Sequence, residues 1–243
     1  MSLNDQLKDE LTRLWVTDVN SDLSIRLASE VHEFWLNNGL KDPKQREGFK
    51  FVPLEITNKD YMKNLLAARD VIDFWSGLSM DREGFLSMVN SMKQDEIKLF
   101  GSYTKFLDQV IDNMDPLLPL DVAMNNALEA FSSGDANNFY LKLASIKQRI
   151  AWAKYVSKNE QDRFDTSSPD GFNQNHKKYS RFKNQWVPYD KLSASDQSND
   201  LGIIAVITSR AMKRAGVNLP EELWLRYSAL REAAGDSITT LDR

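Results

Sequence analysis

The chain has 243 residues, of which 42% are hydrophobic and 27% are charged, a balance typical of an ordered globular protein. Its net charge of −4 argues against a protein that coats nucleic acid, because neutralising many phosphates requires an excess of Lys and Arg. The absence of cysteine excludes disulfides, thiolate catalysis and cysteine-based zinc sites. No apolar run is long enough to span a membrane, and Met1 to Glu10 is polar and acidic, unlike a signal peptide. We therefore expect a cytoplasmic protein without membrane contact.

Helical apolar spacing dominates residues 1–157. It recurs at 3–15, 23–35, 61–75, 85–92 and 103–114. Thr57 and Asp60 have the spacing of a capping box, and Gly77 follows the last turn of that helix. Beyond the break at 116–119, residues 122–131 predict a short helix that Gly134 ends. Asp135 is then expected to cap a longer helix that reaches Trp152 or Ala153.

The C-terminal part begins with a change of pattern. Residues 158–185 lose the helical spacing and gather Asn, Ser, Asp, Gly and Pro, which predicts a long loop. A helix then starts at Ser193 and ends at Gly216, although 203–208 taken alone also fits a strand. Pro220 is placed to begin a final helix. The chain is therefore predicted to be all-α, with about eight helices and one long loop near 158–192.

The segment Trp186 to Asp196 has the features of a helix start. Pro188 fixes its own φ and makes Val187 extended, so the chain enters straight. Leu192 is placed to act as a hydrophobic staple before Ser193, the expected N-cap, and Asp196 puts negative charge in the first turn. The segment thus predicts a buried helix rather than a reactive loop.

The spacing of five residues in this segment matches a known motif: Pro188, Tyr189, Leu192, Asp196 and Asp200. This pattern resembles the ryanodine-receptor (RyR) repeat, a small helical module of calcium-release channels that also occurs in phage and bacterial proteins. The likeness departs from the family at Gln197, where lysine is usual, and at Leu201, where arginine is common. His176 to Tyr179 stands in place of the histidine-x-x-tryptophan element, and the glycine-tryptophan-x-x-glycine turn is missing.

The resemblance implies a division of the chain into 1–157 and 158–243, the second holding the RyR-like helical region. A degenerate copy would lie at 23–76, because Phe51-Val52-Pro53 parallels Trp186-Val187-Pro188, and 81–157 would be a helical insert. The alternative is a chance alignment of 49–76 with 186–212, since an extended X-Pro before a capped helix is common. We favour the alternative.

Basic and aromatic side chains alternate just before this segment, and they supply the candidate binding site. The residues are His176, Lys178, Tyr179, Arg181, Phe182, Lys183, Trp186 and Tyr189. Such an alternation suits stacking on bases while touching phosphates. The alternative, which we favour, is a solvated basic loop whose aromatic rings pack into the core, with Trp186 anchoring the following helix.

Catalytic signatures are scarce. His32 and His176 lie far apart, and there is no glycine-rich phosphate loop, histidine pair at i, i+4 or nucleophile elbow. The carboxylates at Asp18 and Asp22, and those at 108, 112 and 115, predict solvated helix faces. We expect no catalytic residue, no metal ion and no cofactor.

The sequence therefore favours a non-enzymatic helical interaction or structural protein of phage or bacterial type. It would act through a protein partner or as a homo-oligomer, in the cytoplasm or, if phage-encoded, in the virion. The alternative is a nucleic-acid or nucleotide binder that uses the basic aromatic segment 176–190, which the net charge does not favour. An enzyme with an unrecognised carboxylate site is the third hypothesis.

Overall fold

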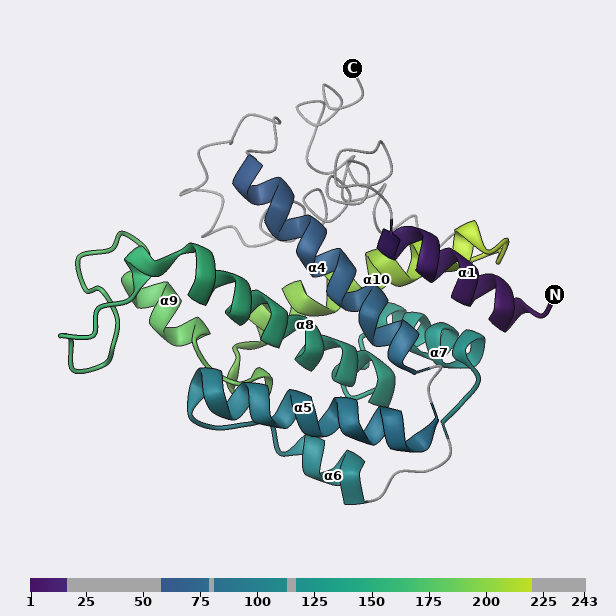
Figure 1. Ribbon diagram of the computed structural model, residues 1–243, viewed down its shortest axis with the longest axis horizontal. Coiled ribbons are helices and arrows are strands. Elements are labelled where there is room, and N and C mark those ends of the chain that lie inside the picture. Colours follow the sequence, from purple (N-terminus) through teal and green to yellow (C-terminus); the bar gives the residue numbers. More distant parts are fainter. Residues whose placement is uncertain (17–57, 79–80, 113–116, 220–243) are drawn as a thin grey trace.

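The computed structural model describes residues 1–16, 58–78, 81–112 and 117–219, and these ranges are mainly helical (Figure 1). Their eight α-helices are α1 (Leu3–Val16), α4 (Asn58–Gly77), α5 (Arg82–Phe100), α6 (Phe106–Asp112), α7 (Leu120–Ser133), α8 (Phe139–Asn159), α9 (Tyr179–Gln185) and α10 (Ala194–Arg214). Two 3₁₀ turns, η1 (Gln161–Arg163) and η2 (Tyr189–Lys191), lie in the segment between α8 and α10. The all-α prediction is confirmed for the described residues.

Helix α8 lies at the centre of this arrangement. It packs against α4, α5, α7 and α10, while α1 covers α4 and α10 at the opposite edge from α9 (Figure 1). The buried apolar side chains of these helices form one hydrophobic cluster that extends from Leu7 to Met212. The predicted regions 1–157 and 158–243 therefore both contribute to the same core.

Several predicted helix boundaries are confirmed. Ser193 is the N-cap of α10, and its hydroxyl accepts a hydrogen bond from the backbone N–H of Asp196 at 3.1 Å. Gly134 and Gly216 follow α7 and α10 with φ of +78° and +85°, the left-handed region that favours glycine. Residues 203–208 lie inside α10, so the strand alternative for them is wrong.

Three boundaries differ from the prediction. Asn138, not Asp135, caps α8, because its side chain accepts hydrogen bonds from the backbone N–H of Tyr140 and Leu141. The helix expected from Tyr103 begins only at Phe106, since Thr104 is held by a buried carboxylate. The loop predicted for 158–185 contains η1 and α9, which the loss of periodicity concealed.

Some predictions fall on residues outside the described ranges. These are the stripe at 23–35 with His32, the Pro53 echo, the capping residue Thr57, the carboxylates at Asp18, Asp22 and Asp115, and the helix expected from Pro220.

Candidate functional site

The Pro188-Tyr189 segment is held by a buried carboxylate. Glu96 of α5 is 0% exposed and accepts hydrogen bonds from the backbone N–H of Tyr189, at 3.3 Å, and of Thr104, at 2.6 Å. The Thr104 hydroxyl donates a third bond to it at 3.0 Å. Burial raises the pKa of Glu96, and these hydrogen bonds oppose the rise. One side chain thus fixes the turn after α5 and the entrance to η2.

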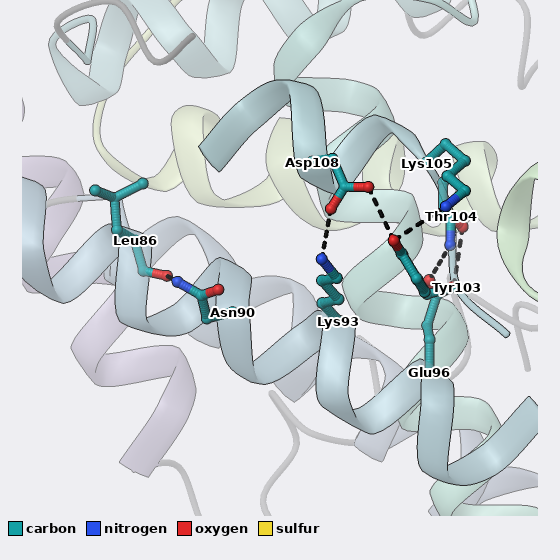
Figure 2. A network of polar contacts seen from close by, with 8 residues as sticks. All are labelled: Leu86, Asn90, Lys93, Glu96, Tyr103, Thr104, Lys105 and Asp108. Atoms are coloured by element: carbon teal, nitrogen blue, oxygen red, sulfur yellow. Dashed lines mark hydrogen bonds and ion pairs between the residues drawn. The ribbon is translucent and has the colours of Figure 1, made fainter. Parts of the chain in front are cut away.

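A more exposed polar network stabilises the same turn (Figure 2). Asp108 of α6 accepts hydrogen bonds from Lys93, at 2.6 Å, and from the Tyr103 hydroxyl, at 2.9 Å. Lys105 donates to that hydroxyl at 3.0 Å. Hydrogen bonding to Lys93 lowers the pKa of Asp108. The predicted acidic face at Asp108 therefore has a structural role in docking α6 on α5.

A buried cation lies on the other side of the Pro-Tyr segment. Arg149 of α8 is 4% exposed, and its Nε donates to the Val187 carbonyl at 3.4 Å. Its guanidinium lies 4.0 Å from the centre of the Trp152 ring, a cation–π distance. Burial lowers the pKa of Arg149 to about 10, against the attraction of Asp200, Asp196 and Glu96. Arg149 therefore joins the chain before Pro188 to α8.

Six rings pack around the approach to this segment. We call them the aromatic cluster: Phe100, Trp152, Phe164, Phe172, Phe182 and Trp186. Phe182 and Trp186 meet with ring centres 5.3 Å apart, and the indole N–H of Trp186 donates to the Leu99 carbonyl at 3.0 Å. The cluster attaches α9 and the preceding loop to α5 and α8.

Asp170 organises the loop before α9. It accepts hydrogen bonds from the Tyr179 hydroxyl at 2.5 Å and from Lys183 at 2.8 Å, while the Ser168 hydroxyl donates at 2.9 Å. The bonds from Lys183 and Tyr179 hold the pKa of Asp170 well below its usual range. A loop without helical spacing is thereby given one conformation in its contact with α9.

The predicted binding residues separate into an inner and an outer group. Phe182 and Tyr189 are 1% and 2% exposed, and Trp186 is half-buried in the aromatic cluster. Tyr179 and His176 are half-buried, and His176 lies 3.5 Å from the Asp162 carboxylate. Lys178, Arg181 and Lys183 are exposed. Phe182, Trp186 and Tyr189 are therefore covered, whereas the three cations are exposed to solvent.

Burial also changes the pKa of the Tyr189 hydroxyl. Burial of its side chain raises the pKa of Tyr189, the first residue of η2, to about 12, although Ser145 of α8 opposes the rise. Its carbonyl accepts a hydrogen bond from the Gln197 amide of α10 at 3.1 Å. Tyr189 thus lies in the core as a packing residue, and its backbone ties α5 to α10.

The residues that determine this geometry were not predicted from the sequence. Glu96, Arg149 and Asp170 each occur among other charged residues, so nothing in their spacing separates them from solvated charge. The i+4 interval from Met92 to Glu96 was the one available signal, because it places Glu96 on the buried side of α5.

The described residues contain no group of three or more side chains suited to a metal ion. None of the described helices is long and apolar enough to cross a bilayer. Comparison of the chain with family models, curated proteins and solved structures finds no match.

Proposed function

We propose that this chain is a non-enzymatic helical protein that acts through protein–protein contacts. The RyR-like resemblance adds the proposal of a phage or bacterial origin, with a location in the host cytoplasm or the virion. What supports the interaction role is how the charged groups around Pro188 are used. Glu96 accepts from backbone and hydroxyl groups of its own chain, and Arg149 donates to a backbone carbonyl. These groups hold segments in place rather than meet a substrate.

The observation that carries the proposal is the two-sided construction of α9. Its inner side is fixed by the aromatic cluster, while Arg181, Lys183 and Asn184 remain exposed. A short helix anchored in this way presents a set of polar side chains in a fixed arrangement. Presentation of a rigid surface lowers the entropy cost of binding a partner.

A nucleic-acid or nucleotide binder using 176–190 is the alternative function. It has the exposed cations in its favour, but stacking on bases requires rings that can be reached. Phe182 and Tyr189 are buried, and the Trp186 ring packs against four others of the aromatic cluster. We therefore place this function second.

Site-specific photo-crosslinking tests the proposal. A photoreactive residue would replace exposed Asn184, and the matched control would carry it at exposed Glu129 on α7. In bacterial cells, we expect a discrete protein adduct at 184 that survives nuclease treatment and is absent at 129. The adduct would contain a second copy of the chain if the partner is itself, and light scattering would then give a mass above the monomer. A strictly monomeric mass with polynucleotide as the sole adduct would overturn the proposal.

A further inference from the structure

The outward side of residues 177–184 is a surface of one charge. Its exposed residues are Lys177, Lys178, Ser180, Arg181, Lys183 and Asn184, and none of them is acidic. Lys178 is the N-cap residue of α9 and Arg181 follows three positions later, a spacing that brings side chains to one side of a helix. This is a local exception in a chain of net charge −4.

The carboxylates near this surface interact with residues other than Lys177, Lys178 and Arg181. Glu160 is buried and paired with Arg163, while Asp170 accepts from Tyr179 and Lys183. The exposed Asp162 lies near His176. Among the described residues, no carboxylate forms an ion pair with Lys177, Lys178 or Arg181.

Neighbouring cations act on Lys178. Partial burial lowers the pKa of Lys178, and the neighbouring charges of Arg163, Lys177 and Arg181 lower it further, against the attraction of Glu160. Like charges held close together repel, and an anionic partner removes that repulsion. The aromatic cluster and Asp170 fix the backbone beneath them, so the cations are held together before any partner arrives.

We propose that Lys177, Lys178 and Arg181 form the docking surface for a short acidic segment of a partner protein. The proposal rests on the protein-binding function proposed above and names the chemistry of its partner. Three cations at the start of α9 and just before it can pair with Asp and Glu side chains spaced along a peptide. Charge interactions are screened over about 8 Å at physiological salt, so a short segment is attracted by this surface more than it is repelled by the net charge.

A nucleic acid fits the same surface less well. The affinity of a nucleic acid comes from many phosphate contacts and from stacking. This surface has three cations that form no ion pair with another described residue, and the Phe182 and Tyr189 rings beside them are buried. An extended polyanion would also meet the acidic remainder of the chain. Duplex DNA is therefore the competing probe in the experiment.

The experiment measures fluorescence polarisation of a labelled peptide with alternating Glu and Gly, a Gln and Gly peptide, and a short DNA duplex. The full chain is compared with Lys177→Glu/Lys178→Glu/Arg181→Glu and with Lys8→Glu/Arg82→Glu/Lys98→Glu, which changes the net charge equally at other exposed positions. We expect the Glu peptide to bind, and the first variant to bind it at least about tenfold more weakly. The second should remain within about twofold of the unchanged chain. Higher salt should weaken binding.

Three results would overturn the inference: no binding of the Glu peptide, equal loss in both variants, or tighter binding of the duplex through the same cations. A version with the three cations replaced by Gln, checked by circular dichroism, separates lost charge from lost fold. The crosslinking at 184 keeps the two proposals distinguishable. If the adduct persists in the charge-reversed variant, the protein-binding function is supported and the proposal of an acidic partner segment is contradicted. If no adduct forms even with the unchanged chain, the function itself fails.

Discussion

Two regions of this molecule are held together by different means. The main core joins seven of the described helices through mostly aliphatic side chains at helical spacing, from Leu7 to Met212. The aromatic cluster instead attaches the irregular 160–185 segment to α5 and α8, and hydrogen bonds to polar side chains such as Asp170 support it. Each aromatic side chain buries roughly 150–250 Å², so a few rings can hold a segment that has no periodic apolar face. Regular helices pack through apolar side chains at periodic positions, whereas an irregular loop can be held by a small number of large buried side chains.

Replacing a large residue of the main core should give the largest effect. Trp75 is 0% exposed, and its indole N–H donates to the Thr208 hydroxyl at 2.8 Å. Trp75→Ala leaves a cavity between α4 and α10 and should lower the free energy of unfolding by about 3–5 kcal/mol. Urea unfolding followed by circular dichroism measures this loss. A loss under about 1 kcal/mol would show that the main core is not the stabilising unit we describe.

The matched substitution in the aromatic cluster should act locally. Phe182→Ala removes the ring that meets Trp152, Phe164, Phe172 and Trp186, at a local cost of about 2–4 kcal/mol. Hydrogen exchange should then become faster in 160–185 while α4 and α10 stay protected. Phe182→Leu is the milder control. A uniform loss of protection would show that the two regions unfold as a single unit.

Glu96 lies where the two regions meet, and its removal should affect both. Glu96→Ala leaves the backbone N–H groups of Thr104 and Tyr189 without their acceptor, which should cost about 2–3 kcal/mol. Glu96→Gln keeps one acceptor oxygen and should cost less. Urea titration of both variants provides the measurement, and equal costs would contradict the role of the carboxylate as an acceptor.

The pH dependence of the main core should follow Asp70 of α4. Burial raises the pKa of Asp70 from 3.8 to about 7, Lys147 and Lys154 oppose the rise, and Asp73 adds to it. Because the folded state binds this proton more tightly, its contribution to stability is complete below pH 3.8 and is lost as the pH rises to about 7. In the Asp70→Asn variant, the loss of stability between these pH values should be smaller by about 1–2 kcal/mol. The effect is limited to this size because Asp70 is only partly buried and Lys147 attracts its charged form. Thermal unfolding of both proteins at several pH values would measure this difference. The same pH dependence in both proteins would contradict the role given to Asp70.

The smallest effect is expected in the loop before α9. The pKa of Asp170 is held low by Lys183 and Tyr179, so its contribution is present above the ordinary value of 3.8 and is lost as the pH falls below it. Asp170→Asn should speed proteolytic cleavage within 165–178 several-fold and leave the global unfolding midpoint unchanged. Ser167→Ala serves as a control in the same loop. Unchanged cleavage would mean that the rings alone order the segment.

Helical spacing was enough to predict most of the described fold. Leu7, Leu11 and Leu14 repeat at intervals that only a helix places on one side, and each is buried in α1. Side-chain chemistry also predicted the start of α10, because Ser193 had the required spacing to Asp196. Local rules such as these act within one or two turns and can be read from neighbouring residues.

The candidate site was predicted less fully, since its contacts join residues far apart in the chain. The Trp186 indole reaches Leu99, and the Tyr189 backbone reaches Glu96, across 87 and 93 positions respectively. The periodicity of apolar residues carries no information on contacts between residues so far apart in the chain. The expectation that rings at 176–186 are buried was correct for Phe182. Helix α9 itself was not predicted, because only one of its seven side chains is buried and one apolar position gives no helical periodicity.

The contact between Trp152 and Trp186 has an optical consequence. Their ring centres lie 5.8 Å apart with planes inclined at 51°, a geometry in which the two indole transitions couple as an exciton pair. The circular dichroism of the folded chain should therefore contain a paired band of opposite signs, which either Trp→Phe substitution removes. Because one indole sits on α8 and the other follows α9, any event that turns the short helix against the long one would be visible in that band without an added label.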